Sequence, residues 1–285
     1  MVAFLVTALS VAAVLTPIVA SVSLVYRVSG VVNFGGGFIA VFGGIACAHW
    51  GSGWAGVALT LVAGAVIGAL CYFIAIVPAR RFGVRGIGLT LSTLGFGLLL
   101  TFVTRSWFGG TAFTVRPWLA GSIDIAGFQT SQQRLLIIGL AIVVVLVLFG
   151  VFDWTLVGRR LSAVSYDAEL ASVYGIRGGR YQLLAWVVSG LCLVIGGMFE
   201  ATLASVDVEV APRLLVLSLV GAVIGGLTSL TGAIGGALVA AVATTISDQF
   251  VATGFQMTAL LIVLSVVLLV RPNGLFSFRG TAERL

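Results

Sequence analysis

The chain has 285 residues, of which 60% are hydrophobic and 8% charged, with a formal net charge of +6 and a mean hydropathy of +1.21. A soluble domain carries roughly 25% charged residues, so this chain could not cover a water-facing surface of its size. The composition therefore predicts an integral membrane protein. Lysine is absent, which excludes a P-loop lysine for ATP binding and a Schiff-base lysine.

The residues that bind metals or form disulfides are few and scattered. His49 is the only histidine, and Cys47, Cys71 and Cys192 form no Cys-x-x-Cys pair. Because metal sites draw on clustered His, Cys or carboxylate ligands, we expect neither a metal site nor a disulfide framework, and no cofactor on this chain. The N-terminal apolar stretch, Val2 to Tyr26, is too long for a signal peptide and lacks a basic start, so it predicts a first span.

Long apolar stretches recur along the whole chain. A bilayer core needs about 20 apolar residues per helix, and the period-2 alternation of a membrane barrel is missing. The predicted spans are 3–26, 34–50, 55–77, 88–105, 133–152, 181–203, 213–230, 232–252 and 256–270. The boundary between the seventh and eighth is weak, so we expect about eight to ten spans. The predicted fold class is all-α: one polytopic transmembrane helical bundle over 1–285, with broken or re-entrant glycine-rich segments.

The arginines predict the orientation of the bundle. Three segments are rich in arginine: the 78–87 loop, the polar segment 153–180 and the C-terminal tail, which includes Arg279 and Arg284. Alternating spans put all three on one side, which the positive-inside rule assigns to the cytoplasm. The N-terminus, the loop 106–132 and the acidic stretch with Asp207 then lie outside. A multi-pass protein with a cytoplasmic C-terminus is predicted.

Two glycine clusters lie at or within the predicted spans, one at 33–37 and one at 225–236. Irregular backbone at membrane depth is tolerated where it is buried in protein or lines a polar cavity. Interrupted segments in two halves of a chain indicate a transport path, whereas ordinary tight turns between helices are the alternative. The candidate path residues are Asn33, Phe34, Gly35, Gly36, Gly37, Thr228, Ser229 and Thr231.

The polar segment 153–180 contains the signals of a short helix. Asp167 is a good N-cap, Glu169 lies in the first turn, and Gly175 suits the position after the last helical residue. A helix of about two turns is only marginally stable by itself in water, so it needs stabilising contacts with another surface. Its apolar edge consists of Leu170, Val173 and Tyr174. The helix could lie on the membrane surface, pack on its own protein or sit in a groove of a partner.

Four motifs together resemble one family. Residues 158–176 resemble the conserved cytoplasmic loop of permeases in branched-chain amino-acid ABC importers, which reads approximately Gly-Arg-x-x-Arg-Ala-x-x-x-Asp-x-x-x-Ala-x-x-x-Gly-Ile. The segments 32–37, 225–236 and 270–276 are similar to three further motifs in the family's order, so the resemblance covers nearly the whole chain. The chain departs from the family at Ser162, where an arginine is usual, at Tyr166, where an acid is usual, and at Gly36, where a polar residue is usual.

The resemblance implies a role and partners. The loop helix would be a coupling helix that docks on a separate ABC ATPase subunit, which binds the ATP. The coupling residues implied are Gly158, Arg159, Arg160, Val164, Asp167, Glu169, Leu170, Ala171, Tyr174 and Gly175. A second permease subunit, similar or identical, and an extracytoplasmic solute-binding protein would complete the importer in a prokaryotic inner or plasma membrane. The binding protein would meet loop 106–132 and the 207–213 stretch. The solute would be a branched-chain or other amino acid, or a small amide such as urea.

Other functions are disfavoured by the residues available. An ion-coupled secondary transporter of a small neutral solute usually needs ionisable groups near the bilayer midplane, and Glu200 and Asp248 lie near predicted span ends. Such a transporter remains the alternative function. An intramembrane enzyme needs a catalytic constellation, which one histidine, no lysine and few buried acids hardly allow. A pure scaffold would leave the broken glycine segments unexplained.

Overall fold

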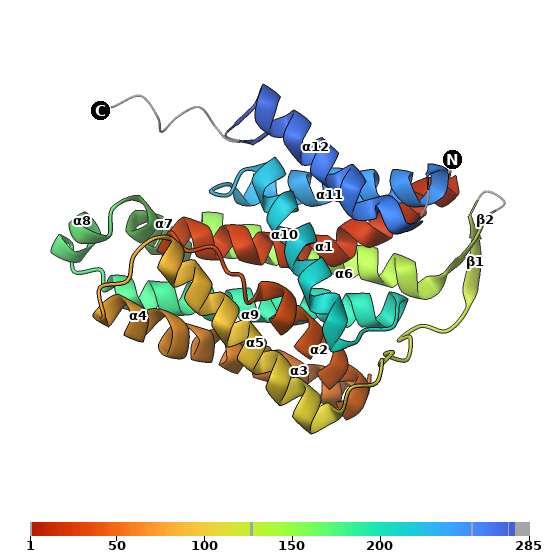
Figure 1. Cartoon of the computed structure of the whole chain (residues 1–285), viewed down its shortest axis with the longest axis horizontal. Helices are drawn as coiled ribbons and strands as arrows, with labels where there is room; N and C mark the ends of the chain where they lie inside the picture. Colours follow the sequence, from red (N-terminus) through yellow and green to blue (C-terminus); the bar gives the residue numbers. More distant parts are fainter. Residues whose placement is uncertain (1, 126–127, 252, 273, 277–285) are drawn as a thin grey trace.

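The chain folds as a bundle of helices aligned with its long axis (Figure 1). The computed structural model describes residues 2–125, 128–251, 253–272 and 274–276; Arg279 and Arg284 lie outside it, as do the side chains of Asp153 and Glu169. The helices are α1 Val2–Ser29, α2 Gly36–Trp50, α3 Trp54–Cys71, α4 Val77–Arg81, α5 Ile87–Phe108, α6 Gln132–Phe149, α7 Leu156–Tyr166, α8 Ala168–Val173, α9 Gly178–Leu203, α10 Ala211–Gly225, α11 Leu230–Phe250 and α12 Gln256–Val270. Two π-helical turns, η1 Tyr72–Ile76 and η2 Gly150–Trp154, extend α3 and α6.

The helices match the predicted spans. Within the described residues, seven helical segments are long and apolar enough to cross a membrane, and α2 and α12 are shorter apolar helices. The seven are 2–29, 54–81, 87–108, 132–152, 178–203, 208–225 and 230–250. Each of the nine predicted spans coincides with one of these helices, and the all-α fold class is confirmed. In lipid, this is the expected outcome because a helix satisfies its own backbone hydrogen bonds.

Two central helices organise the bundle. α1 and α9 pack against each other; α9 also packs on α2 and α3, and α1 also packs on α10 and α11. The two helices run in opposite directions along the long axis (Figure 1). The contacts of the two helices correspond: α9 packs on the two helices that follow α1, and α1 packs on the two helices that follow α9.

Glycine lets the helix backbones around α9 touch. A β-carbon on Gly190 would collide with the carbonyl oxygen of Gly64 and lie 3.0 Å from the Cα of Gly68. On the next turns of α9, a β-carbon on Gly197 would collide with the carbonyl oxygen of Ala40. Small residues at such crossings let the backbones approach closely. The resulting dispersion contacts hold the helices together, since lipid provides no hydrophobic force between them. The Gly64 and Gly68 pair thus serves packing.

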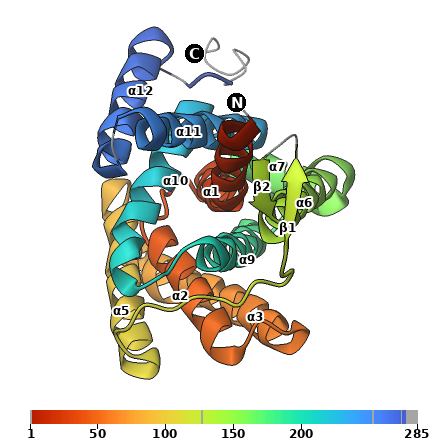
Figure 2. The ribbon, with the colours of Figure 1, turned by 90° about the vertical axis from the view of Figure 1, so that its right-hand side faces the viewer.

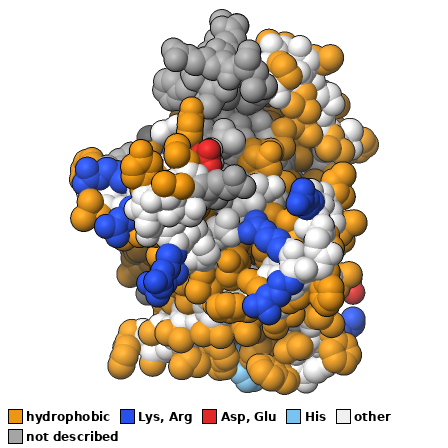
Figure 3. Space-filling view, turned by 90° about the vertical axis from the view of Figure 1, so that its left-hand side faces the viewer, with side chains coloured by type: hydrophobic (Ala, Val, Ile, Leu, Met, Phe, Trp, Pro, Cys, Tyr) orange, Lys and Arg blue, Asp and Glu red, His pale blue; other side chains and the backbone are white. Residues whose placement is uncertain are grey.

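The two ends of the bundle differ in charge and covering. The 78–87 loop, α7, α8 and the start of α9 lie at one end, on the left of Figure 1, and Figure 3 shows arginine side chains spread across that end. We call it the arginine-rich end. Figure 2 looks onto the opposite end, where the hairpin β1 Ser122–Ile125 and β2 Phe128–Ser131 stands. The sequence did not predict this hairpin.

The loop 106–132 is fastened across the end opposite the arginine-rich end. Phe113 and Val206 exchange backbone hydrogen bonds of 2.9 and 2.8 Å, and the Val115 amide donates to the Ala201 carbonyl. The indole of Trp118 donates to the Ser52 carbonyl at 2.9 Å. The loop is therefore held against the ends of α9 and the α2–α3 turn.

Replacing Gly190 by Val should destabilise the bundle because the new side chain would force α9 away from α3. We expect a loss of about 1–3 kcal/mol, the usual cost of overpacking. The check is the thermal unfolding midpoint of the purified chain in detergent. Gly139→Val is the matched control, since Gly139 is an exposed helical glycine with no atom within 4 Å of the added carbon. Equal unfolding midpoints for the two variants would contradict the packing role.

Candidate functional site

The polar segment 153–180 folds as two helices, of which the sequence predicted one. The unpredicted helix, α7, buries Leu161 in a cluster with side chains of α1, α6 and α9, and Val164 on the same helix is also buried. Its signal was Thr155, whose hydroxyl accepts the Gly158 amide at 3.2 Å as an N-cap. Through these buried side chains α7 is packed onto the bundle.

The predicted short helix, α8, has both of the caps expected from the sequence. The Asp167 carboxylate accepts the Leu170 amide at 2.9 Å. Gly175 has a φ of +78°, and the amides of Gly175 and Ile176 donate to the carbonyls of Ser172 and Ala171. These two bonds form a Schellman motif, which ends a helix through a left-handed residue. The backbone of α8 is thus terminated at both ends by local contacts.

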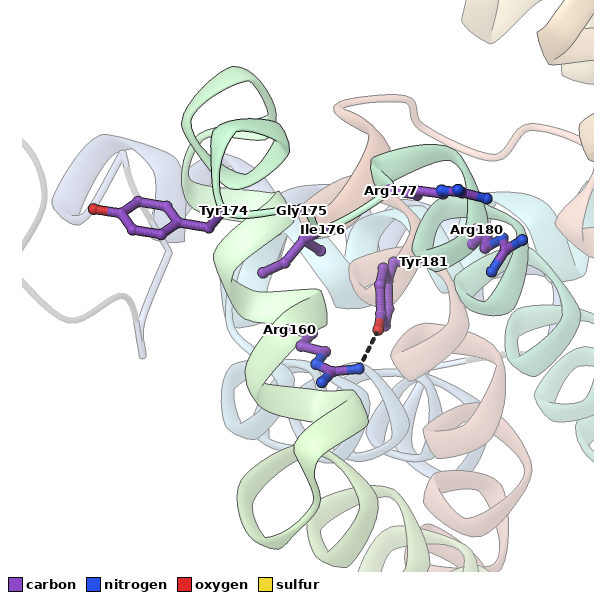
Figure 4. A pocket seen from close by; sticks show the side chains of 7 residues that line it. All are labelled: Arg160, Tyr174, Gly175, Ile176, Arg177, Arg180 and Tyr181. Atoms are coloured by element: carbon purple, nitrogen blue, oxygen red, sulfur yellow. Dashed lines mark hydrogen bonds between the residues drawn. The ribbon is translucent and has the colours of Figure 1, made fainter.

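The apolar edge of α8 is uncovered. Leu170, Val173 and Tyr174 are 54%, 80% and 78% exposed, whereas Ala171 faces inward at 4%. Figure 4 shows Tyr174 pointing away from the bundle. Of the three settings that the sequence left open, packing on the protein itself is therefore not observed for this edge. The two other settings are contact with the membrane surface and binding in a groove of a partner.

The residue that departs from the family loop has a local explanation. Ser162 accepts a hydrogen bond from the guanidinium of Arg27, at the end of α1, at 3.2 Å. An arginine at 162 would put two like charges at this contact, which costs free energy. The other departure, Tyr166, is 82% exposed. Arg160 donates to the Tyr181 hydroxyl at 3.3 Å (Figure 4), so α7 is also tied to α9.

The first glycine cluster forms a re-entrant turn. After α1 ends at the arginine-rich end, the chain returns into the bundle and α2 begins beside α5. The Phe34 amide donates to the Thr93 hydroxyl at 2.9 Å, and the Gly35 amide donates to Asn33 Oδ1 at 3.0 Å. Asn33 is 1% exposed, and its Nδ2 has no hydrogen-bond partner among the described residues. A free amide donor thus lies at the start of α2.

The structure pairs this turn with a segment that the sequence assigned to the outside. Residues 204–210 enter from the opposite end, and α10 begins where Gly37 leaves room for the Ala211 carbonyl and the Leu215 amide. Asp207 caps the 3-10 turn Val208–Val210 that leads into α10, by accepting the amides of Glu209 and Val210. The missed signals were this aspartate and Pro212 at the helix start, which are typical of a helix N-terminus.

The second glycine cluster lies elsewhere. It breaks the chain between α10 and α11 at Gly226, with φ of +105°, and Ser229 caps α11 by accepting the Gly232 amide. Gly37 contacts the first turn of α10, so this break lies about 20 Å further along the same helix. Asn33, Phe34, Gly35, Gly36 and Gly37 are therefore not adjacent to Thr228, Ser229 and Thr231.

The C-terminal motif packs onto this second break. The amides of Leu275 and Phe276 donate to the carbonyls of Ile224 and Gly225 at 2.8 and 3.3 Å. The ring of Phe276 occupies the space left by Gly235. Two of the four motifs thus form one structural unit, and this contact explains part of the glycine content there.

Comparison with known proteins decides the family. Residues 4–270 match the profile described as branched-chain amino acid transport system / permease component. The chain belongs to this family of permeases. It is a multi-pass membrane protein, and the recognition made from the four motifs is confirmed.

Relatives of this permease are known by name. LivH of Salmonella typhimurium, a high-affinity branched-chain amino acid transport system permease protein, is 26% identical over 161 residues, which are 55% of this chain and 52% of LivH. LivH of Escherichia coli is 25% identical over the same lengths. The permease matches about half the length of these relatives. A solved structure, PsaBC from Streptococcus pneumoniae in complex with Fab, is 17% identical with a TM-score of 0.48 over 95% of this chain and 92% of that chain.

Removing the Thr93 hydroxyl should weaken the re-entrant turn of the permease. Thr93→Val keeps the shape but leaves the Phe34 amide without its acceptor, at a cost of about 1–3 kcal/mol. We expect a lower thermal unfolding midpoint in detergent and a lower rate of solute uptake in cells. Thr101→Val on the same helix is the control, because that hydroxyl bonds only to its own helix at Gly97. If Thr101→Val proves equally damaging, the turn is not the cause.

Proposed function

We propose that the chain is the permease subunit of an ATP-driven ABC importer for branched-chain or other amino acids, or for small amides such as urea. ATP would be hydrolysed on separate subunits, and the arginine-rich end would face the cytoplasm, as the positive-inside rule favours. The single observation that carries the proposal is the capped helix α8, with its uncovered apolar edge, on a chain of this permease family.

The contacts of α7 and α8 suit a coupling role. α8 offers Leu170, Val173 and Tyr174 to a groove on a partner, which is how short amphipathic helices are often bound. Its neighbour α7 is bonded to α1 through Ser162 and to α9 through Arg160. A displacement of α8 by an ATPase subunit would therefore reach the two central helices directly. The coupling residues Gly158, Val164 and Ala171 support this link by being buried.

The translocation path is proposed to pass the two re-entrant starts of α2 and α10. Helix N-termini present free amides, and discontinuous helices of this kind hold solutes in other transporter folds. The free Nδ2 of Asn33 would add a donor there. The second break, with Thr228, Ser229 and Thr231, is proposed as the part of the path nearer the cytoplasm, since its helix α11 begins toward the arginine-rich end.

The opposite end is proposed to receive a solute-binding protein. The backbone pairing of Phe113 with Val206 joins loop 106–132 to the 204–210 segment, which leads directly into α10. Contact with a binding protein at this loop would thus reach the start of α10. A second permease subunit, similar or identical, would complete the membrane part of the importer.

Gly175→Val should uncouple ATP hydrolysis from uptake. A β-carbon at a left-handed residue costs about 1–2 kcal/mol, so the Schellman end of α8 would be lost. Reconstituted transporter should keep its ATPase activity while uptake per ATP falls several-fold. Gly83→Val is the matched control, because Gly83 has a φ of +76°, open space around it, and a place on another loop at the same end.

Two outcomes would count against the proposal. Normal uptake per ATP in Gly175→Val would remove the coupling role of α8. Uptake that persists in ATP-depleted cells with an ion gradient would instead favour the ion-coupled secondary transporter.

A further inference from the structure

A basic hollow lies between α7 and the start of α9, beside the coupling segment. Its volume is about 380 Å³, and Arg160, Arg177, Arg180 and Tyr181 line it together with the 174–176 turn. Figure 4 shows Arg177 and Arg180 on one side of Tyr181 and Arg160 on the other. None of the described lining residues is acidic. The hollow therefore concentrates positive charge without a counter-charge of its own.

Two of these arginines are free to bind a ligand. Arg160 already donates to Tyr181. The side chains of Arg177 and Arg180 are exposed and make no hydrogen bond or ion pair to any described residue. Nearby Arg80 differs, because it donates to Gln182 and to the Ser29 carbonyl. Arg177 and Arg180 thus offer unused guanidinium donors, a group that binds the oxygens of a phosphate well.

A second, apolar hollow continues from the same arginine pair. Its volume is about 430 Å³; Tyr72, Phe73, Val77 and Leu183 line it, and it shares Arg177 and Arg180 with the basic hollow. Phe73 is 52% exposed on the outer side of η1, so this hollow opens sideways. It lies where the 54–81 span ends and the 178–203 span begins. Because both spans end there, a bilayer around the bundle would place its headgroups at this level.

We infer that Arg177 and Arg180 bind the phosphate of an anionic phospholipid whose acyl chain lies in the apolar hollow. A free phosphate would leave the apolar hollow unused. A protein arriving from the water phase would meet the basic hollow but not the sideways opening beside Phe73. A lipid has both parts in this order, and basic pockets beside membrane helices are typical headgroup sites. The inference goes beyond the proposed function and does not depend on ATPase docking.

The site would link lipid composition to the coupling segment. The bound headgroup would lie against the turn formed by Tyr174, Gly175 and Ile176, which ends α8. Anionic lipid at the arginine-rich end would hold this turn against the start of α9.

Native mass spectrometry of the delipidated full chain tests the site. The chain is titrated with phosphatidylglycerol, with phosphatidylcholine of the same acyl chains, and with inorganic phosphate. We expect phosphatidylglycerol to bind most tightly, and Arg177→Gln with Arg180→Gln to weaken it about tenfold or more. Arg81→Gln with Arg85→Gln is the matched control, since both arginines are exposed at the same end and line neither hollow. Equal losses in the two double variants would overturn the site in favour of bulk charge.

A second pair of variants tests the apolar hollow. Gly179 lines it, and an added β-carbon would meet only the Tyr72 hydroxyl oxygen, at 3.7 Å. Gly179→Leu should therefore fill the hollow and weaken phosphatidylglycerol binding severalfold, while Gly179→Ala leaves it near wild type. Unchanged phosphatidylglycerol binding in Gly179→Leu would show a simple anion site and overturn the lipid proposal. Inorganic phosphate that binds as tightly as phosphatidylglycerol would do the same. Complete loss of the lipid on addition of an ATPase subunit would assign the hollow to that partner instead.

Discussion

Close contact between helix backbones at α9 is the constraint on which the rest of the structure depends. Lipid offers no hydrophobic force to press helices together, so the bundle relies on dispersion contacts and small residues. Gly190 and Gly197 bring α9 against α3 and α2, and α1 covers another face of α9. Once α9 is held at the centre, the segments on both sides of it have a fixed place. The re-entrant turns and the coupling helices take their positions from that arrangement.

The two re-entrant segments show why broken helices are tolerated here. The segment before α2 is mostly buried against protein, whereas Ala204, Ser205 and Glu209 before α10 are exposed. In both segments backbone amides find local acceptors: Thr93 and Asn33 on one side, Asp207 on the other. Their helices, α2 and α10, meet at Gly37 because no side chain stands between them. Two helix N-termini from opposite ends of the molecule thus share one region, which an unbroken pair of helices would not create.

The arginine-rich end combines rigid and available parts. Leu161 anchors α7 in an apolar cluster, Val164 is buried beside it, and Arg27 with Ser162 links the helix to α1. By contrast, Val173 and Tyr174 on α8 remain uncovered, and Arg177 and Arg180 remain unbonded within the described chain. Charged and apolar groups that a membrane protein leaves unused beside a packed helix are natural contact points for a partner or a lipid.

The sequence alone determined the features that depend on neighbouring residues. Apolar runs marked the spans, because bilayer thickness sets their length; Asp167 and Gly175 marked both ends of α8, because caps are local hydrogen bonds. Only the tertiary structure decided which segments meet. The contact of Gly37 with Ala211 and Leu215 and that of Ser162 with Arg27 join positions far apart in the chain, and the distance of Ser229 from Asn33 is likewise set by the fold. Such contacts depend on how whole helices cross, which no local pattern specifies.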